Sequence, residues 1–346
     1  MNLPIIYPTT LSLLTTMYCT AQCLNCCFQC SPKRKERMSF EDIKFYIDKT
    51  VSLFPTIQLV VFSGGESFSL KEDLIQSVQY ATNKKLSTRI VTNGFWAISY
   101  KKAYSILKSL KEAGLHEINF STGDDHQEWV QYDNIVYGCL AARSLGINAL
   151  VNIETHPNST FGRDIFEKDE RIFPFIGKEM HNPDHIKIMQ GVWLPFDENT
   201  KKMRDAAPKS YRSITPTYKS CETMFHTISL MPNGDIYSCC GLTCLQIPYL
   251  RIGNMKNSTV QSIISNQFDD VLKIWLRTEG PVRILEFLYK NSPDKLKQID
   301  YSKHICEVCR DICVNRKNIE KIKENIKELL PNILIKYNLL YSSIKK

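Results

Sequence analysis

The sequence predicts an α/β protein in which a partial (β/α)6 TIM-like barrel precedes a smaller cysteine-rich domain. Short apolar runs alternate with longer helical stretches between Thr9 and about Ile188, a rhythm typical of parallel strands with covering helices. Hydrophobic residues make up 43% and charged residues 23% of the 346, which is the composition of an ordinary globular protein. Thirteen cysteines, most of them in three groups, mark the region after the barrel and the loop after the first strand.

Each barrel element is expected from its own pattern. The apolar runs predict six strands, namely Leu11–Met17, Ile57–Phe62, Thr88–Val91, Glu117–Ser121, Asn148–Ile153 and His185–Met189. The stretches between them predict helices at Phe40–Leu53, Glu72–Asn83, Lys101–Ala113, Asn134–Leu145 and, from a weaker pattern, Phe161–Asp169. Ser39 is placed to cap the first helix, and Gly114 and Gly146 are placed to end two others.

The barrel rhythm ends before a polar segment that carries Pro208 and Pro216. We therefore assign residues 1–196 to the barrel and 197–216 to a linker. Residues 217–313 form the second domain, in which Pro232-Asn233-Gly234-Asp235 predicts the turn of a hairpin between Thr227–Met231 and Ile236–Cys239. A helical stretch is expected from about Ser258 to Tyr289.

Residues 314–346 predict a basic amphipathic helix that is interrupted at Pro331. This segment carries eight basic and three acidic residues, so it supplies five of the eight excess positive charges of the chain. We interpret the charge as a solvated helix face and expect no nucleic-acid partner. No run approaches 18 apolar residues and no secretory signal is visible, so we expect a cytoplasmic protein without a membrane segment.

Grouped thiols in such a chain indicate metal or redox chemistry rather than disulfides. Cys19, Cys23 and Cys26 spell C-x3-C-x2-C directly after the first strand. Three thiolates at this spacing can hold three irons of a [4Fe–4S] cluster and leave the fourth iron for a small molecule. A zinc site that uses Cys27 and Cys30 as a second pair is the alternative.

Three polar motifs end the next strands: Ser63-Gly64-Gly65-Glu66, Thr92-Asn93-Gly94 and Ser121-Thr122-Gly123-Asp124. Together with the cysteine motif they resemble the radical S-adenosylmethionine (SAM) superfamily, although Asn25 stands where the family signature has an aromatic residue. The resemblance implies that a reduced cluster cleaves SAM to a 5′-deoxyadenosyl radical. It also implies SAM contacts from Gly64, Gly65 and Glu66 to the amino group, from Ser121 and Asp124 to the ribose, and from Asn93.

The spacing Cys221-x12-Gly234-x4-Cys239 resembles the opening of SPASM and twitch extensions, which carry auxiliary [4Fe–4S] clusters. The chain continues only with Cys306-x2-Cys309-x3-Cys313, which fits the twitch version with one auxiliary cluster. The resemblance implies Cys221, Cys239, Cys306 and Cys309 as ligands, with Cys313 as the competing choice. A structural zinc ion on the same ligands is the alternative.

The doublet Cys239-Cys240 suggests a division of roles. Neighbouring residues on an extended strand point to opposite sides, so one thiol can bind a cluster while the other stays free. A free thiol donates hydrogen atoms readily, and its return of hydrogen to the opposite face of an α-carbon would invert that carbon. An inert, buried Cys240 fits the sequence equally well.

The run from Cys26 to Pro32 (Cys-Cys-Phe-Gln-Cys-Ser-Pro), followed by Arg37-Met38, resembles the YydG-type (EpeE) radical SAM peptide epimerases. This resemblance implies conversion of L- to D-residues in a ribosomally made precursor peptide, with Cys240 as hydrogen donor and Cys244 as its competitor. It further implies an electron donor of the flavodoxin or ferredoxin type.

The alternatives are a peptide cross-linking maturase, a twitch-type dehydrogenase and a non-catalytic iron–sulfur electron carrier. Eighteen residues precede Cys19, too few for a leader-binding domain, so we expect the leader to bind elsewhere. For His126, Glu154 and His156, near strand ends, we expect ordinary polar packing.

Overall fold

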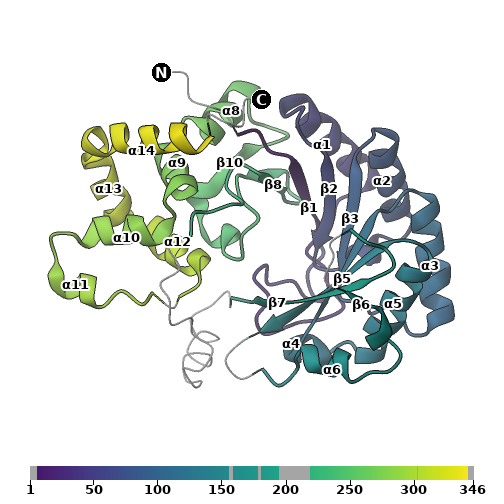
Figure 1. The fold of residues 1–346 in the computed structure, drawn as a ribbon. Helices are drawn as coiled ribbons and strands as arrows, with labels where there is room; N and C mark the ends of the chain where they lie inside the picture. Colours follow the sequence, from purple (N-terminus) through teal and green to yellow (C-terminus); the bar gives the residue numbers. More distant parts are fainter. Residues whose placement is uncertain (1–5, 156–158, 178–180, 195–218, 302, 342–346) are drawn as a thin grey trace. The chain divides into compact units, whose positions relative to one another are not determined.

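The computed structural model describes residues 6–155, 159–177, 181–194, 219–301 and 303–341 (Figure 1). The chain forms two compact units. The barrel unit comprises residues 10–209 with 230–233, and the cysteine-rich unit comprises residues 1–9, 210–229 and 234–346. The predicted linker at 197–216 lies outside the described residues, and the domain bounds remain predictions.

The barrel unit confirms the predicted fold class. Its strands are all parallel and follow the order β1-β2-β3-β4-β5-β7-β6. The six predicted strands are present within three residues at each end, and the two-residue strand β6 is an addition. Their bounds are Thr10–Thr16 (β1), Leu59–Gly64 (β2), Ser87–Thr92 (β3), Glu117–Thr122 (β4), Asn148–Thr155 (β5), Ile176–Gly177 (β6) and Ile186–Val192 (β7).

The helices of this unit lie along the outer side of the strands (Figure 1). Ser39 and Asp42 form a capping box, in which each side chain accepts the backbone N–H of the other residue. Gly114 and Gly146 end α3 and α5 with positive φ angles of 99° and 65°. The helices are α1 (Phe40–Leu53), η1 (Ser67–Leu70), α2 (Glu72–Asn83), α3 (Tyr100–Glu112), α4 (Asp124–Gln127), α5 (Tyr132–Ser144), α6 (Arg163–Glu167) and η2 (Phe173–Phe175).

The core lies between these helices and the sheet, and it fixes how closely they approach. Phe120 of β4 is fully buried, and its ring lies directly beneath Gly138 of α5. A Cβ atom on Gly138 would come within 2.6 Å of that ring. The glycine therefore lets α5 pack closely on β4, whose C-terminal end carries several of the predicted site residues.

The cysteine-rich unit contains three neighbouring strands and a group of helices (Figure 1). The predicted hairpin is confirmed, because β8 and β9 flank the expected turn. The strands are β8 (Thr227–Leu230), β9 (Asp235–Tyr237) and β10 (Arg251–Asn254). The helices are η4 (Cys244–Gln246), η5 (Pro248–Leu250), α8 (Val260–Phe268), α9 (Val271–Thr278), α10 (Pro281–Tyr289), α11 (Pro293–Lys297), α12 (Ile305–Val314), α13 (Arg316–Glu324) and α14 (Ile326–Tyr341).

One helix prediction for this unit is confirmed and one is wrong. The helical stretch expected near 258–289 is present as three helices, because the Asp270 side chain caps α9 and Gly280, at φ 81°, precedes Pro281 at the start of α10. The break expected at Pro331 occurs at Asn325, whose side-chain amide donates to the Lys321 carbonyl at 2.8 Å. Pro331 lies inside α14.

None of the helices within the described ranges is long and apolar enough to cross a membrane.

Candidate active site

The turn after β2 packs directly on the segment that leads to Cys19. The N–H of Gly65 donates to the Thr16 carbonyl at 2.6 Å, and the N–H of Glu66 donates to the Tyr18 carbonyl at 2.8 Å. A Cβ atom on Gly65 would lie 2.0 Å from the Tyr18 oxygen. Only glycine therefore fits at position 65, and the cysteine loop is held against the end of β2.

The cysteine loop itself is closed by hydrogen bonds. Cys19 N–H donates to the Ser31 carbonyl at 3.2 Å, which joins the two ends of the loop. Two backbone N–H groups point at sulfur: Ala21 N–H lies 3.4 Å from Cys19 Sγ, and Cys30 N–H lies 3.4 Å from Cys26 Sγ. Such donors favour thiolates, the form in which cysteine binds iron.

Cys19, Cys23 and Cys26 lie within electrostatic range of one another. Burial raises the pKa of Cys19 to about 12 and raises the pKa of Cys23 further, and the neighbouring thiols add to both effects. A hydrogen bond from the Cys30 thiol instead lowers the pKa of Cys26. Two of the three sulfurs thus need positive charge nearby to lose their protons, which iron would supply.

The described cysteines do not have the arrangement of a single-ion site. No three His, Cys, Asp or Glu side chains in the described part of the chain are grouped to hold one metal ion. Zinc requires its sulfur ligands about 2.3 Å from the same ion, whereas a cluster takes one thiolate per iron. The C-x3-C-x2-C spacing and the backbone N–H donors to sulfur are compatible with thiolate ligands of a cluster.

Glu66 ties the end of β2 to the end of β3. Its fully buried carboxylate accepts hydrogen bonds from the N–H groups of Phe68 (3.1 Å) and Asn93 (2.8 Å) and from the Thr92 hydroxyl (2.8 Å). Burial raises its pKa to about 7, against the opposing effect of these donors. The side chain is thus occupied by the protein, while the Gly65 carbonyl oxygen accepts no hydrogen bond from any described residue.

Asn93, expected to contact SAM, faces the cysteine loop. Its Nδ2 lies 3.6 Å from Cys19 Sγ and 3.1 Å from Thr20 Oγ1. Its Oδ1 accepts the N–H of Phe95 at 3.0 Å. The structure therefore brings Asn93 close to Cys19. This residue, Cys23 and Cys26 are the three cysteines of the C-x3-C-x2-C motif and are called the first thiol group below.

The two residues at the end of β4 that are predicted to contact SAM, Ser121 and Asp124, have different surroundings. Ser121 is buried at the strand end. The Asp124 carboxylate accepts hydrogen bonds from Thr160, at 2.6 and 2.8 Å, which ties it to a neighbouring loop. The next residue, Asp125, is buried and accepts the N–H of Asn25, within the cysteine loop, at 2.9 Å. Sequence analysis missed Asp125, although the acidic doublet at a strand end was a visible signal.

His126 and Glu154 form a buried hydrogen-bonded pair, with 2.6 Å between His126 Nδ1 and Glu154 Oε2. Glu154 Oε1 also accepts the N–H of Asp125 at 2.6 Å. Gly123 makes room for this carboxylate, because a Cβ there would lie 2.2 Å from Glu154 Cγ. The negative charge of Glu154 contributes to the raised pKa of Cys23, so the pair lies close to the first thiol group. His156 lies outside the described residues.

A second thiol group, made up of Cys221, Cys239 and Cys306, lies within the cysteine-rich unit. Gly241 N–H donates to Cys239 Sγ at 3.0 Å. A Cβ atom on Gly241 would lie 3.1 Å from Cys239 Sγ and 3.2 Å from Cys306 Sγ, so both sulfurs face one small space that glycine leaves open. The charge of Cys221 contributes to the raised pKa values of Cys239 and Cys306, so Cys221 lies close to both sulfurs.

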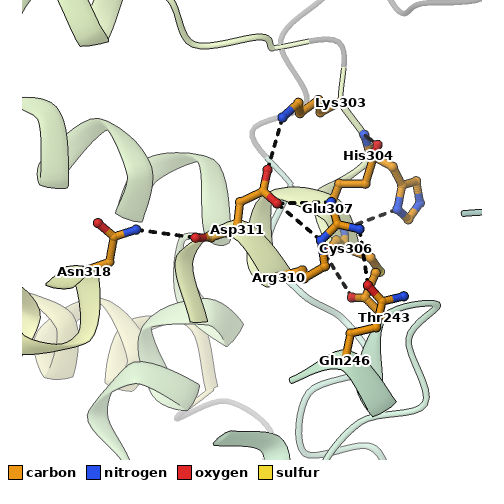
Figure 2. A network of polar contacts seen from close by, with 9 residues as sticks. All are labelled: Thr243, Gln246, Lys303, His304, Cys306, Glu307, Arg310, Asp311 and Asn318. Atoms are coloured by element: carbon orange, nitrogen blue, oxygen red, sulfur yellow. Dashed lines mark hydrogen bonds and ion pairs between the residues drawn. The ribbon is translucent and has the colours of Figure 1, made fainter. Parts of the chain in front are cut away.

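A polar network holds the start of α12 against the loop after Cys240 (Figure 2). The Thr243 hydroxyl donates to the Cys306 carbonyl at 2.9 Å, and Arg310 donates to Gln246 at 3.2 Å. His304 caps the helix by accepting the Cys306 N–H at 3.2 Å. These contacts fix the position of Cys306 relative to Cys239.

Cys309 and Cys313 differ in what they face. Their sulfurs lie 4.0 Å apart on α12. The hydrogen bond with Cys313 and burial raise the pKa of Cys309, and the charges of Cys239 and Cys221 add to this rise. The charge of Cys313 instead tends to raise the pKa values of Tyr249 and Lys273. Cys309 therefore lies within electrostatic range of Cys239 and Cys221.

The thiols near Cys239 differ in exposure. Cys239 is 6% exposed and Cys244 is 2% exposed, whereas Cys240 is only partly buried. Burial raises the pKa of the Cys240 thiol, and the side chain of Thr227 in β8 opposes this rise. Cys240 is thus the accessible member of the three.

Replacing Gly65 by Ala tests the contact that holds the cysteine loop. Because the added methyl group overlaps the Tyr18 oxygen, we expect a loss of about 3 kcal/mol or more in the free energy of unfolding, measured with denaturant on the metal-free protein. Gly146→Ala is the control, since it introduces a strained φ but meets only Lys111 Nζ at 3.8 Å, and should cost about 1 kcal/mol. Equal losses would contradict the close approach.

Replacing Glu66 by Gln tests its buried charge. The Glu66 carboxyl has a pKa of about 7 in the folded protein, against an ordinary value of 4.5. Because the folded state binds this proton more tightly than the unfolded state, the proton stabilises the fold. That stabilisation is complete below pH 4.5 and is lost as the pH rises through 7. The free energy of unfolding of the wild type minus that of Glu66→Gln should fall by about 2 to 4 kcal/mol over this range. Denaturant titrations at several pH values measure it, and a constant difference would count against a raised pKa.

Known proteins resemble this chain in sequence and in fold. No family model matches the chain. A curated relative, the putative peptide biosynthesis protein YydG of Bacillus subtilis (strain 168), is 22% identical over 308 residues, which cover 88% of this chain and 91% of the relative. Two solved structures of anSMEcpe are similar in fold, each at 12% sequence identity. The structure with bound AdoMet has a TM-score of 0.52, and the match covers 96% of this chain and all of the other. The structure with AdoMet and Cp18Cys peptide has a TM-score of 0.51, and the match covers 96% of this chain and 99% of the other. The chain thus has the fold of the radical SAM enzymes and, in sequence, resembles the YydG-type among them.

Proposed function

We propose that the protein is a radical SAM enzyme that converts an L-residue of a ribosomally made precursor peptide to its D-form, with Cys240 as the hydrogen donor. The observation that carries this proposal is the contrast between two adjacent thiols. Cys239 is buried, receives the Gly241 N–H and faces Cys306. Cys240 is partly exposed, and burial raises the pKa of its thiol while Thr227 opposes this rise. We assign Cys239 to the auxiliary cluster and Cys240 to the reaction with substrate, because Cys240 is the more exposed of the two.

The first cluster is assigned to Cys19, Cys23 and Cys26, which the loop gathers and partly supplies with N–H donors. The Gly65 carbonyl, without a partner among described residues, is the acceptor for the SAM ammonium group. Ser121 and Asp124 remain the assignments for the ribose. These residues would hold the cluster and SAM, which when bound would supply a 5′-deoxyadenosyl radical able to remove hydrogen from a C–H bond.

The auxiliary cluster is assigned to Cys221, Cys239, Cys306 and Cys309. The space beside Gly241, open to two of these sulfurs, supports this assignment. The interaction of Cys309 with Cys239 and Cys221 favours it over Cys313 as the fourth ligand.

Exposure favours Cys240 over Cys244 as donor, because a donor must reach the substrate carbon. In the proposed step, the S–H bond of Cys240 breaks and a C–H bond forms on the opposite face of the α-carbon radical. The sulfur radical left on Cys240 then takes up one electron and one proton, with a flavodoxin- or ferredoxin-type protein as the source of electrons. The substrate ends with unchanged mass and inverted configuration.

A peptide substrate is supported by the name of the curated relative, a putative peptide biosynthesis protein. The solved structure of anSMEcpe with a bound peptide shows that a protein of this fold accommodates one. We therefore expect the precursor peptide, rather than a small metabolite, to bind this chain.

Reaction in D2O tests the proposed function. A candidate peptide encoded beside this gene is incubated anaerobically with reconstituted protein, SAM and reductant, and is then analysed by mass spectrometry. We expect a gain of about one mass unit at a single residue, because the exchangeable thiol of Cys240 returns deuterium. Cys240→Ala should abolish this label while SAM is still cleaved, and Cys244→Ala, the matched control, should retain it.

Other outcomes assign other functions. A loss of about two mass units would indicate a cross-linking maturase or a dehydrogenase. A protein that holds iron but cleaves no SAM would be an electron carrier. A label lost in Cys244→Ala and kept in Cys240→Ala would reverse the assignment of the donor.

Replacing Gly241 by Ala tests the auxiliary site. The added methyl group would occupy the space between Cys239 Sγ and Cys306 Sγ. We expect reconstituted protein to fall from about eight to about four irons per chain, as in Cys306→Ala, while SAM cleavage by the first cluster persists. Full iron content in Gly241→Ala beside a loss in Cys306→Ala would show that this space is not part of the site.

A further inference from the structure

The side chain of Asn93 lies between the end of β3 and the first thiol group. We infer that Asn93 donates a hydrogen bond to the Cys19 sulfur and thereby raises the reduction potential of the first cluster. The inference rests on the proposed function, in which Cys19 is an iron ligand. It gives Asn93 a role as a positioning residue that tunes the cluster, in place of the SAM contact expected from sequence.

The hydrogen-bond partners fix which end of the amide faces sulfur. Oδ1 accepts the Phe95 N–H at 3.0 Å, so the oxygen must face that donor. Nδ2 is then directed to Cys19 Sγ at 3.6 Å and to Thr20 Oγ1 at 3.1 Å, both of which can accept. Reversing the amide would set its NH2 against an N–H and its oxygen against a thiolate.

The backbone of Asn93 is held as firmly as its side chain. Its N–H donates to Glu66 Oε2 at 2.8 Å, and Glu66 is fully buried. Thr92 joins the same carboxylate at 2.8 Å and accepts hydrogen bonds from Gly94 N–H and Trp96 Nε1, both at 3.0 Å. Asn93 itself is 5% exposed, so water does not compete for its amide.

Reduction adds one negative charge to a cluster, and its sulfur ligands carry part of that charge. A hydrogen bond to a ligand sulfur stabilises the reduced form more than the oxidised form, and the potential rises. Ala21 N–H also donates to Cys19, but only proline would remove this backbone donor, and proline would also restrict the conformation of the loop. The Asn93 amide can be removed, which makes its contribution measurable.

The test is a redox titration followed by EPR on the full-length, reconstituted protein without SAM, with dithionite as reductant. The signal of the first cluster is identified in a parallel sample as the one that changes when SAM is added. Asn93→Ala should lower its midpoint potential by about 59 mV, equivalent to a tenfold weaker uptake of one electron. Asn93→Asp should lower it further, because it keeps the acceptor for Phe95 but places an oxygen against sulfur.

Thr20→Ala is the matched control. It removes the other acceptor of Nδ2 while leaving the contact with Cys19, so its potential should equal that of the wild type. Equal potentials in wild type, Asn93→Ala and Asn93→Asp, with the first cluster present in each, would overturn the inference. Loss of that cluster from both Asn93 variants but not from Thr20→Ala would also overturn it, because Asn93 would then serve assembly. A wild type without a first cluster would instead refute the proposed function.

Discussion

The arrangement of the barrel site depends on the approach of Gly65 to the Tyr18 carbonyl. Parallel pairing brings Thr16 of β1 beside Gly64 of β2, and the two glycines let the chain continue in contact beyond the strands. The cysteine loop is thereby fixed to the end of β2. Glu66 accepts the N–H of Asn93 at the end of β3, and the Asn93 side chain contacts Cys19. The cysteine loop is thus held by both β2 and β3, so the position of the first thiol group depends on the sheet as well as on the loop.

The two thiol groups are built by different means. The first depends on residues far apart in sequence, because Asp125 and Asn93 reach the cysteine loop from the ends of β4 and β3. The second depends on the turn after β9 and on the start of α12, joined by the contact between Thr243 and Cys306. Burial, together with nearby carboxylates, raises the pKa values of Cys19 and Cys23, whereas a hydrogen bond from Cys30 lowers the pKa of Cys26. Cys19 and Cys23 therefore favour the protonated form, and bound iron would supply the positive charge that stabilises their thiolates.

Much of the barrel could be predicted because its hydrophobic periods are regular and its glycines mark helix ends. The breaks beside Asp270 and at Asn325 could not, because they depend on local caps within continuous apolar patterns. The cysteine spacings and strand-end motifs indicated the candidate site. The directions of its side chains were not predictable: Asn93 turns towards sulfur because Glu66 and Phe95 hold it there. Asp124 turns away because Thr160 binds it, and the next residue takes the inner position.

Gly241 leaves open a small space that two sulfurs of the cysteine-rich unit face. Cys306 and Cys239 are distant in sequence, yet a methyl group on Gly241 would fall within 3.2 Å of both sulfurs. The same residue donates its N–H to Cys239, and it stands directly after the partly exposed Cys240. A larger residue would crowd both sulfurs directly beside Cys240. Within the proposed function, the binding of the auxiliary cluster and the position of the hydrogen donor therefore both depend on the segment around Gly241.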